Sequence, residues 1–294
     1  MLTRRNLLAA TAAAPLSAST GRMFLCMHQT TSAGSAFRAS LQGYARAGIR
    51  YVEITFPIVG EFLKTGSVAD AKRIIADLGL TAISFGGVRG LAEPHPGRAL
   101  ALEELKRTAG LVAELGIDRL VCPCGATEKF TIDDYARGAE NLREAGEIVK
   151  PLGVTAMLEF MRGSTFAGTL PTALRLTRQA AHPNVRPMFD CYHFWAGLSK
   201  FEDLELLQNG EIHHVHFQDV PDIPREQLDN TTREIPGDGV SPLVRILSKL
   251  AATNYRGPVS VELFYPRLQN GDPYKVAIEI RRKAEPILQQ AGVL

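Results

Sequence analysis

The stretch from residue 133 to residue 160 reads DDYARGAENLREAGEIVKPLGVTAMLEF and predicts one helix followed by one strand. Its first part is amphipathic, and Gly153 stands where the C-cap glycine of a helix is expected. Its second part, VTAMLEF, is a short apolar run typical of a buried parallel strand, and the carboxylate of Glu159 comes near its end. We therefore expect a helix packed outside a buried strand, with a polar group at the carboxyl end of that strand.

The same alternation of strand and helix patterns continues through the chain after about residue 22. Eight such units predict a single (β/α)8 TIM barrel of the α/β class over residues 22–294. A doubly wound open sheet is the alternative, but the run FGGVRG at 85–90 lacks the G-x-G-x-x-G spacing expected of its phosphate loop. The expected strands are residues 23–29, 51–56, 81–87, 119–124, 154–160, 185–190, 212–218 and 258–264.

The composition is that of an ordinary soluble enzyme, since 45% of the 294 residues are hydrophobic and 22% are charged. The formal net charge of +2 gives no electrostatic reason to expect binding to nucleic acid or to an anionic membrane. The four cysteines lack the C-x-x-C spacing of a zinc site and are too few for a disulfide scaffold. We interpret Cys122 and Cys124 as small buried thiols.

The N-terminal sequence MLTRRNLLAATAAAPLSAST has the architecture of an export signal. Arg4 and Arg5 precede an alanine-rich apolar run, as in a twin-arginine signal, although Leu7 and Ala9 depart from the usual residues of that motif. We predict that residues 1–21 are a twin-arginine-type signal peptide and that the protein is periplasmic or otherwise exported; a chain that does not use the signal stays cytoplasmic. The apolar run is too short to span a bilayer, so we expect no stable membrane anchoring.

Three histidines crowd the run EIHHVHFQD at residues 211–219. Because side chains alternate between the two faces of a strand, His214 and His216 share one face and His213 points to the other. His216 then lies at the end of the strand, where a TIM barrel carries its chemistry. Three other expected strands end in a carboxylate, and the complete set of strand-end residues is Glu159, Asp190, His216 and Glu262.

Each of these residues has an ordinary explanation when it is considered alone. Glu159 is then a salt-bridge partner, Asp190 a helix cap, and His216 a hydrogen-bonded core histidine. Together, however, such groups at the edge of a packed core repel one another unless a cation joins them. Three carboxylates and one imidazole suit a divalent ion with open coordination positions, so the sequence predicts a site for one metal ion.

Five motifs resemble the xylose isomerase-like TIM barrels, the sugar-phosphate isomerase/epimerase superfamily, and they extend over nearly the whole chain from about residue 23. Within that superfamily the chain looks most like the inosose isomerase branch, in which D-x-x-H-F, R-x-x-P-G-D-G and V-E-L-F-x-P motifs recur. The motifs in this chain are LEF (158–160), FDCYHFWAG (189–197), HVHFQD (214–219), REIPGDG (233–239) and SVELFYP (260–266).

The resemblance implies one divalent metal ion held by the four strand-end residues, with manganese foremost and zinc, magnesium or cobalt as alternatives. It implies that Glu159 and Glu262 form the catalytic acid/base pair, and that His193 and Arg233 hold substrate oxygens. The superfamily also contains DNA-repair endonucleases with three zinc ions, which need a histidine ligand where Arg233 stands. A guanidinium there would repel a second metal ion, so we expect no nucleic-acid partner.

The implied reaction is isomerisation or epimerisation of a small keto-sugar or keto-polyol, in which a proton is removed next to a carbonyl and an enediolate forms. An exported 3-keto-glycoside lyase, which eliminates a leaving group at the β carbon, is one alternative. A sugar-binding barrel without turnover is another, and it is disfavoured because both glutamates are intact. The sequence does not decide the exact substrate, the metal, or whether the protein forms an oligomer.

Three further residues have two readings each. His28, on the first expected strand, binds substrate or is a polar residue of the barrel. Trp195, which follows His193, forms an apolar wall against a sugar face or packs in the protein interior. Glu53 lines the barrel mouth or is a buried, hydrogen-bonded carboxylate. We include His28 and Trp195 among the expected substrate-binding residues.

Overall fold

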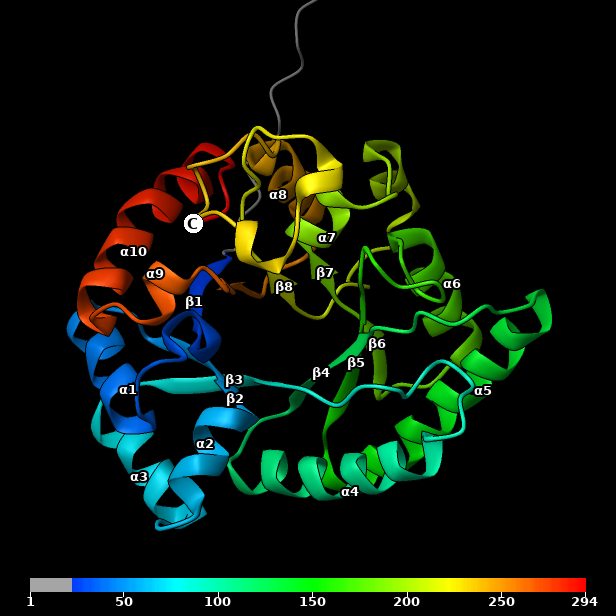
Figure 1. Ribbon diagram of the computed structural model, residues 1–294, viewed down its shortest axis with the longest axis horizontal. Coiled ribbons are helices and arrows are strands. Elements are labelled where there is room, and N and C mark those ends of the chain that lie inside the picture. The colour runs from blue at the N-terminus through cyan, green and yellow to red at the C-terminus, as the bar shows by residue number, and fades with distance from the viewer. Residues whose placement is uncertain (1–22) are drawn as a thin grey trace, which may run out of the picture.

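The computed structural model describes residues 23–294, which fold into a barrel of parallel strands enclosed by helices (Figure 1). The predicted signal peptide, residues 1–21, lies outside the described residues. Neighbouring strands follow the order β6-β5-β4-β3-β2-β1-β9-β8-β7, which confirms the single TIM barrel. The strands are β1 (Phe24–His28), β2 (Tyr51–Thr55), β3 (Thr81–Gly86), β4 (Arg119–Cys124), β5 (Thr155–Phe160), β6 (Val185–Pro187), β7 (Phe189–Asp190), β8 (Val215–His216) and β9 (Pro258–Val261).

The strand expected at 185–190 is divided into β6 and β7 at Met188, so the nine labelled strands make eight barrel strands. β6 pairs with β5, and β7 pairs with β8. The division follows Pro187, which has no N–H to donate to a ladder. The amide of Met188 donates to Leu158 O at 3.1 Å, whereas the next amide donates to His214 O at 2.9 Å. The segment from Pro187 to Phe189 therefore joins β6 and β7, the two edge strands of the sheet, and closes the barrel.

Helices surround the strands on the outside of the barrel (Figure 1). The sixth unit departs from the expected pattern, because the short α7 and the 3-10 helix η3 follow β7 in place of a long helix. Within residues 23–294, no helix combines the length and the apolar character needed to cross a membrane. The helices are α1 (Phe37–Arg46), α2 (Phe56–Leu63), α3 (Val68–Asp77), α4 (Arg98–Glu114), α5 (Ile132–Val149), α6 (Leu170–Ala180), α7 (Cys191–Ala196), α8 (Leu243–Ala252), α9 (Pro266–Gln269) and α10 (Pro273–Gln290), with 3-10 helices η1 (Gln29–Ser32), η2 (Lys150–Leu152), η3 (Phe201–Leu206), η4 (Arg225–Gln227) and η5 (Asn230–Thr232).

The helix ends follow the signals in the sequence. Gly79, Gly116 and Gly153 have φ values of 66°, 79° and 67°, in the left-handed region that glycine enters without strain. At the other end of a helix, Ser67 and Asp70 form a reciprocal capping box that satisfies the first free amides of α3. The C-cap glycine expected at Gly153 ends η2, directly after α5, and Gly79 and Gly116 stand just past the ends of α3 and α4.

The inside of the barrel is filled below the strand ends. Val121, Met157 and Met188 are buried and pack together there. Because alternate residues of a strand share a face, Met157 and Glu159 both point inward from β5, with Glu159 nearer the carboxyl end. These apolar side chains fill the barrel beneath Glu159, on the side of β4, β5 and the passage from β6 to β7.

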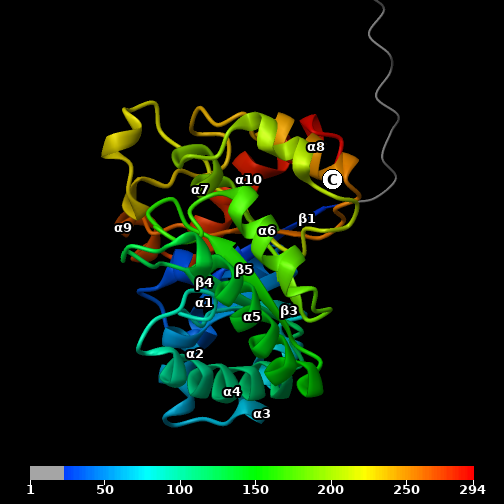
Figure 2. The same cartoon turned by 90° about the vertical axis from the view of Figure 1, so that its right-hand side faces the viewer.

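A long loop connects β8 to α8, and one carboxylate organises it. In the side view of Figure 2 this yellow loop lies on the left, on the side of α9 and opposite the C-terminus of the chain. The carboxylate of Asp219 accepts backbone hydrogen bonds from Val220 (2.9 Å), Gly237 (3.0 Å), Gly239 (3.1 Å) and Ser241 (2.8 Å). Both ends of the loop are thus held by the same buried side chain.

We expect Asp219→Asn to lower the free energy of unfolding by about 1–3 kcal/mol, because the amide has one acceptor oxygen where the carboxylate has two, which leaves buried N–H groups unpaired. Urea unfolding followed by circular dichroism measures the change. Asp222→Asn, at an exposed position of the same loop, is the control and should change stability by no more than about 0.5 kcal/mol. Equal stabilities of the two variants would show that the loop does not depend on this carboxylate.

Candidate functional site

Four polar residues converge where four barrel strands end. Glu159 lies on β5, Asp190 ends β7, His216 ends β8, and Glu262 follows β9 directly. All four are buried, and one potential ligand atom from each lies within 4.8 Å of the others. The carboxyl ends of parallel strands meet at one edge of the barrel, which explains why residues so far apart in the sequence are neighbours here.

The distances among these four atoms fit the binding of one metal ion. His216 Nδ1 lies 3.0 Å from Glu159 Oε1, 3.5 Å from Asp190 Oδ2 and 3.4 Å from Glu262 Oε2. Ligand atoms about 2.1 Å from an ion are about 3.0 Å apart at adjacent octahedral positions. Three carboxylates and an imidazole with this spacing therefore suit a divalent cation. His213 lies outside the cluster, as the strand alternation predicted.

The electrostatics of the cluster favour a positive charge at its centre. Burial opposes protonation of His216, but the carboxylates of Glu262, Glu53 and Glu159 hold the pKa of its imidazole well above the usual value. Burial raises the pKa of the Glu159 carboxyl to about 7, against the opposing effect of His216. The carboxylates thus favour a protonated imidazole in their midst, and a divalent cation would relieve the same repulsion.

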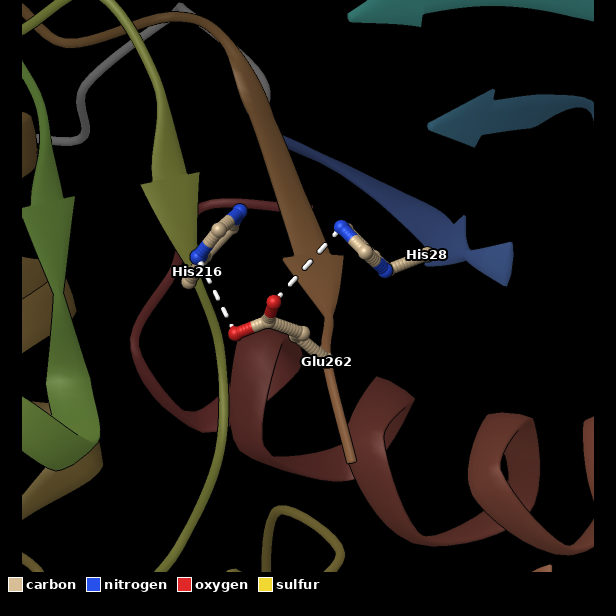
Figure 3. A group of neighbouring side chains, drawn as sticks. All are labelled: His28, His216 and Glu262. Atoms are coloured by element: carbon tan, nitrogen blue, oxygen red, sulfur yellow. Dashed lines mark ion pairs between the residues drawn. The ribbon is translucent and has the colours of Figure 1, made fainter. Parts of the chain in front are cut away.

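His28 approaches the cluster from β1. Figure 3 shows Glu262 between His28 and His216, with one ion pair to each. His28 Nδ1 accepts a hydrogen bond from the amide of Thr30 at 3.1 Å, which leaves the proton on Nε2. That Nε2 lies 3.6 Å from an oxygen of Glu262 and 3.6 Å from one of Glu53. His28 therefore presents an N–H group toward the site.

Arg233 reaches the cluster from the loop between β8 and α8. Its guanidinium donates to Glu262 Oε2 at 2.6 Å and to Asp190 Oδ2 at 3.2 Å, and it lies between the rings of Tyr192 (4.6 Å) and Phe264 (5.0 Å). Arg233 is held in this position because the carboxylate of Asp219 binds both ends of the loop that carries it. The guanidinium is fully buried and places a fixed positive charge beside the carboxylates.

His193 lies next to Arg233, with 3.1 Å between His193 Nε2 and a guanidinium nitrogen. Its backbone amide donates to Asp190 Oδ1 at 2.6 Å, so Asp190 also caps the short helix α7. Both sequence readings of Asp190, cap and cluster member, hold at once. Burial lowers the pKa of the His193 imidazole to about 4, so this side chain is neutral at neutral pH.

Two buried residues support the cluster and were not assigned this place from the sequence. Glu53, on β2, lies 3.3 Å from His216 Nε2 through one oxygen and 2.9 Å from His214 Nε2 through the other. Although burial opposes ionisation, the three neighbouring imidazoles hold the pKa of Glu53 well below its usual value, so it accepts both bonds. When a cation is bound, this contact would keep the proton of His216 on Nε2 and leave Nδ1, which faces the three carboxylates, as the metal-binding nitrogen.

Gln218 is the second supporting residue, and it donates to Asp190 Oδ2 at 2.9 Å. The only sequence signal for Glu53 was a carboxylate inside the apolar strand YVEIT, and Gln218 had no distinct signal. Both contacts join different strands, so strand alternation alone does not predict them.

Trp195 is not brought into the site. Its side chain packs against the small cluster of Tyr192, Ala196, Val220 and Leu228, and the guanidinium of Arg225 lies over its ring at 4.9 Å. The helix α7 directs His193 toward the cluster, and two residues later the side chain points elsewhere. The structure therefore favours the packing reading of Trp195, which is half-buried and is not among the residues that line the cavity above the cluster.

A cavity of about 310 Å³ lies above the cluster. Six predicted site residues line it together: Glu159, His216, Glu262, Arg233, His28 and His193. The remaining wall includes Thr30, Thr55, Pro57, Pro123 and Phe264. Such a cavity combines two carboxylates able to move protons with several fixed N–H donors for oxygen atoms, which suits proton transfer on a small polyhydroxylated molecule.

Comparison with known proteins identifies the family of this chain. Residues 41–284 match the family described as xylose isomerase-like TIM barrel. An inosose isomerase of Halalkalibacterium halodurans is 32% identical over 254 residues, which are 83% of this chain and 89% of that protein. A 3-dehydroshikimate dehydratase of Pseudomonas aeruginosa is 29% identical over 240 residues, which are 80% of this chain and 37% of that protein.

Among solved structures, a crystal structure of the IolI protein with a bound zinc atom has a TM-score of 0.85 and 23% sequence identity, and the alignment covers 91% of this chain and 99% of that one. At this identity the likeness concerns the fold. The sequence match over most of the chain and the inosose isomerase relative go further: this chain belongs to the xylose isomerase-like TIM barrel family.

Proposed function

We propose that this protein is a metal-dependent isomerase or epimerase that acts on a small keto-sugar or keto-polyol. The observation that carries the proposal is the meeting of Glu159, Asp190, His216 and Glu262 at one point of a cavity that also holds a buried arginine. The similarity to inosose isomerases supports the same reaction class.

The four donors would hold one divalent ion, for which manganese is the first candidate and zinc, magnesium and cobalt are alternatives. The zinc atom of the IolI protein supports a divalent ion in this fold. When bound, such an ion polarises a carbonyl and stabilises the negative charge of an enediolate. The donor chemistry on which this rests is the three carboxylate oxygens and one imidazole nitrogen described above.

The side chains of the cavity transfer the protons and bind the substrate oxygens. One of Glu159 and Glu262 removes the proton from the carbon next to the carbonyl, and the other returns a proton to the neighbouring carbon or to the opposite face. His28 donates its Nε2–H to a substrate oxygen. Arg233 holds another oxygen and takes no part in proton transfer, because a guanidinium stays charged at neutral pH.

A lyase is the second candidate. The relative named 3-dehydroshikimate dehydratase favours it, because a dehydratase of a keto compound also removes a proton next to a carbonyl before it expels a leaving group. Isomerase, epimerase and lyase share this first step. The geometry of the two glutamates serves all three, and the fate of the enediolate separates them.

Metal analysis of the purified protein, together with NMR of a panel of keto-sugars and keto-polyols in deuterated water, tests the proposal. We expect about one equivalent of a divalent metal and incorporation of deuterium next to the carbonyl of at least one compound. A chelator should abolish the exchange, and added manganese should restore it. Product signals distinguish a new ketose, an epimer and an elimination product. Exchange that persists in full after complete metal removal would contradict the proposal.

We also propose that the protein is exported through its N-terminal signal, residues 1–21. Mass spectrometry of the mature protein, purified from its native source, should show cleavage near residues 18–22. Replacement of Arg4 and Arg5 by lysine should leave the uncleaved chain in the cytoplasm. An intact N-terminus on the wild-type protein, found only in the cytoplasm, would overturn export.

A further inference from the structure

A second cavity, of about 700 Å³, adjoins the catalytic cavity on the side of β1 and β2. It lies among η1, the start of α1 and helix α2, none of which contributes a residue to the four-donor cluster. The two cavities have common walls, which are formed by Thr30, Thr55, Pro57 and Phe264. We call the second one the outer cavity.

The shared residues place the outer cavity within reach of the reacting groups. The amide of Thr30 holds the ring of His28, and the ring of Phe264 lies under the guanidinium of Arg233 at 5.0 Å. A molecule bound to the donors of the catalytic cavity is therefore separated from the outer cavity by these side chains alone. A substituent on that molecule can extend over them.

The chemistry of the outer cavity favours an apolar occupant. Phe37, Ile58 and Phe62 supply buried or half-buried apolar surface on its sides. Its two charged residues, Arg38 and Glu61, are exposed, and Glu61 is paired with Lys64 at 2.5 Å. Aromatic and aliphatic walls with polar groups at the margin bind flat apolar groups through buried area and ring stacking.

The volumes of the two cavities also favour a substrate that is larger than a free monosaccharide. A cavity of 310 Å³ is at the small end of ligand sites, whereas the two cavities together reach the range that holds drug-sized molecules. A free monosaccharide or inosose would leave the outer cavity unused. We propose, on the basis of the function proposed above, that the substrate is a keto-sugar bearing an aryl or similar apolar substituent, with its ring in the catalytic cavity and its substituent in the outer cavity.

Solvent deuterium exchange with three probes tests this inference: a free 3-keto-hexose, its methyl glycoside and its phenyl glycoside, each of which keeps its carbonyl at carbon 3. The phenyl glycoside should have a KM at least about tenfold below that of the methyl glycoside. Ala36→Trp and Thr65→Trp, exposed positions on the lining of the outer cavity, should each remove most of this preference by filling the space. Ala39→Trp, exposed on α1 but outside the lining, should retain it.

Equal KM values for the phenyl and methyl glycosides would overturn the inference, as would an equal loss of preference in Ala39→Trp. A disaccharide probe that gains the tenfold advantage while the phenyl glycoside does not would replace the apolar occupant by a second sugar. If the free keto-hexose exchanges deuterium without any preference among glycosides, only this inference fails. If neither a keto-sugar nor a keto-polyol exchanges deuterium in the metal-loaded wild type, the proposed function itself fails.

Discussion

Glu159→Gln and Glu262→Gln should each slow deuterium exchange next to the substrate carbonyl by about 10²–10⁴-fold, the range for loss of a general acid or base. Glutamine keeps the shape of the side chain and one oxygen, but it cannot accept the proton. Both residues line the cavity, and their oxygens lie 3.0 Å and 3.4 Å from His216 Nδ1. One oxygen of each can thus remain a ligand while the proton transfer is lost.

Metal content has to be measured on the same samples, since a variant that has lost the ion says nothing about the base. Arg233→Lys is the comparison, because it alters a group that binds oxygen but cannot serve as a base at neutral pH. It should mainly raise KM. If Glu262→Gln exchanges deuterium as fast as the wild type with metal bound, the two-glutamate mechanism is wrong, and His193 is the next base to examine.

The second large effect is expected at Glu53, which is not one of the four donors but lies 3.3 Å from His216 Nε2. Glu53→Gln should weaken metal affinity by about 10–100-fold, the usual cost of losing the carboxylate behind a metal-binding histidine. The carboxylate lies 3.3 Å from His216 Nε2, where it would accept the N–H of the metal-bound imidazole and so leave Nδ1 for the ion. An amide at this position can turn its NH₂ group toward the ring and no longer fixes which nitrogen carries the proton.

Competition with a chromogenic chelator measures this affinity without any activity assay. Glu147→Gln is the matched control, because Glu147 also pairs with a buried histidine, His182, at 3.0 Å, and neither residue belongs to the candidate metal cluster. Its metal affinity should equal that of the wild type. Thermal unfolding of both variants reveals any general loss of structure. A folded Glu53→Gln protein with unchanged affinity would show that Glu53 only fills space.

The order and type of the barrel elements were predictable from local patterns. The strand expected at 154–160 is found at 155–160, and its inward face follows from alternation. The strand expected at 212–218 is regular only at Val215–His216. Periodicity indicates which side chains face inward, but the length of a ladder depends on its neighbours, and the neighbour here is shortened by the break at Met188.

Local sequence patterns also predict only part of the site, because they do not show which side chains of distant strands meet. The four donors stand at strand ends, and the barrel geometry brings all strand ends together. The contact between Glu53 and His216 joins residues 163 positions apart and depends on the angle of two side chains inside the barrel. Trp195 shows the converse, since its position next to His193 suggested a shared role that the turn of α7 removes.

The four donors and most of the lining of the outer cavity come from different segments of the chain. This separation affects how the substrate range of the protein can diverge. The four donors lie on β5, β7 and β8 and directly after β9, while most of the residues that border the outer cavity follow β1 and β2. Random substitution confined to residues 33–38 and 57–65 can therefore alter which molecules are accepted without disturbing the residues that move protons. A library of this kind offers a direct route to enzymes with new substrate ranges, and gene duplication gives natural selection the same freedom.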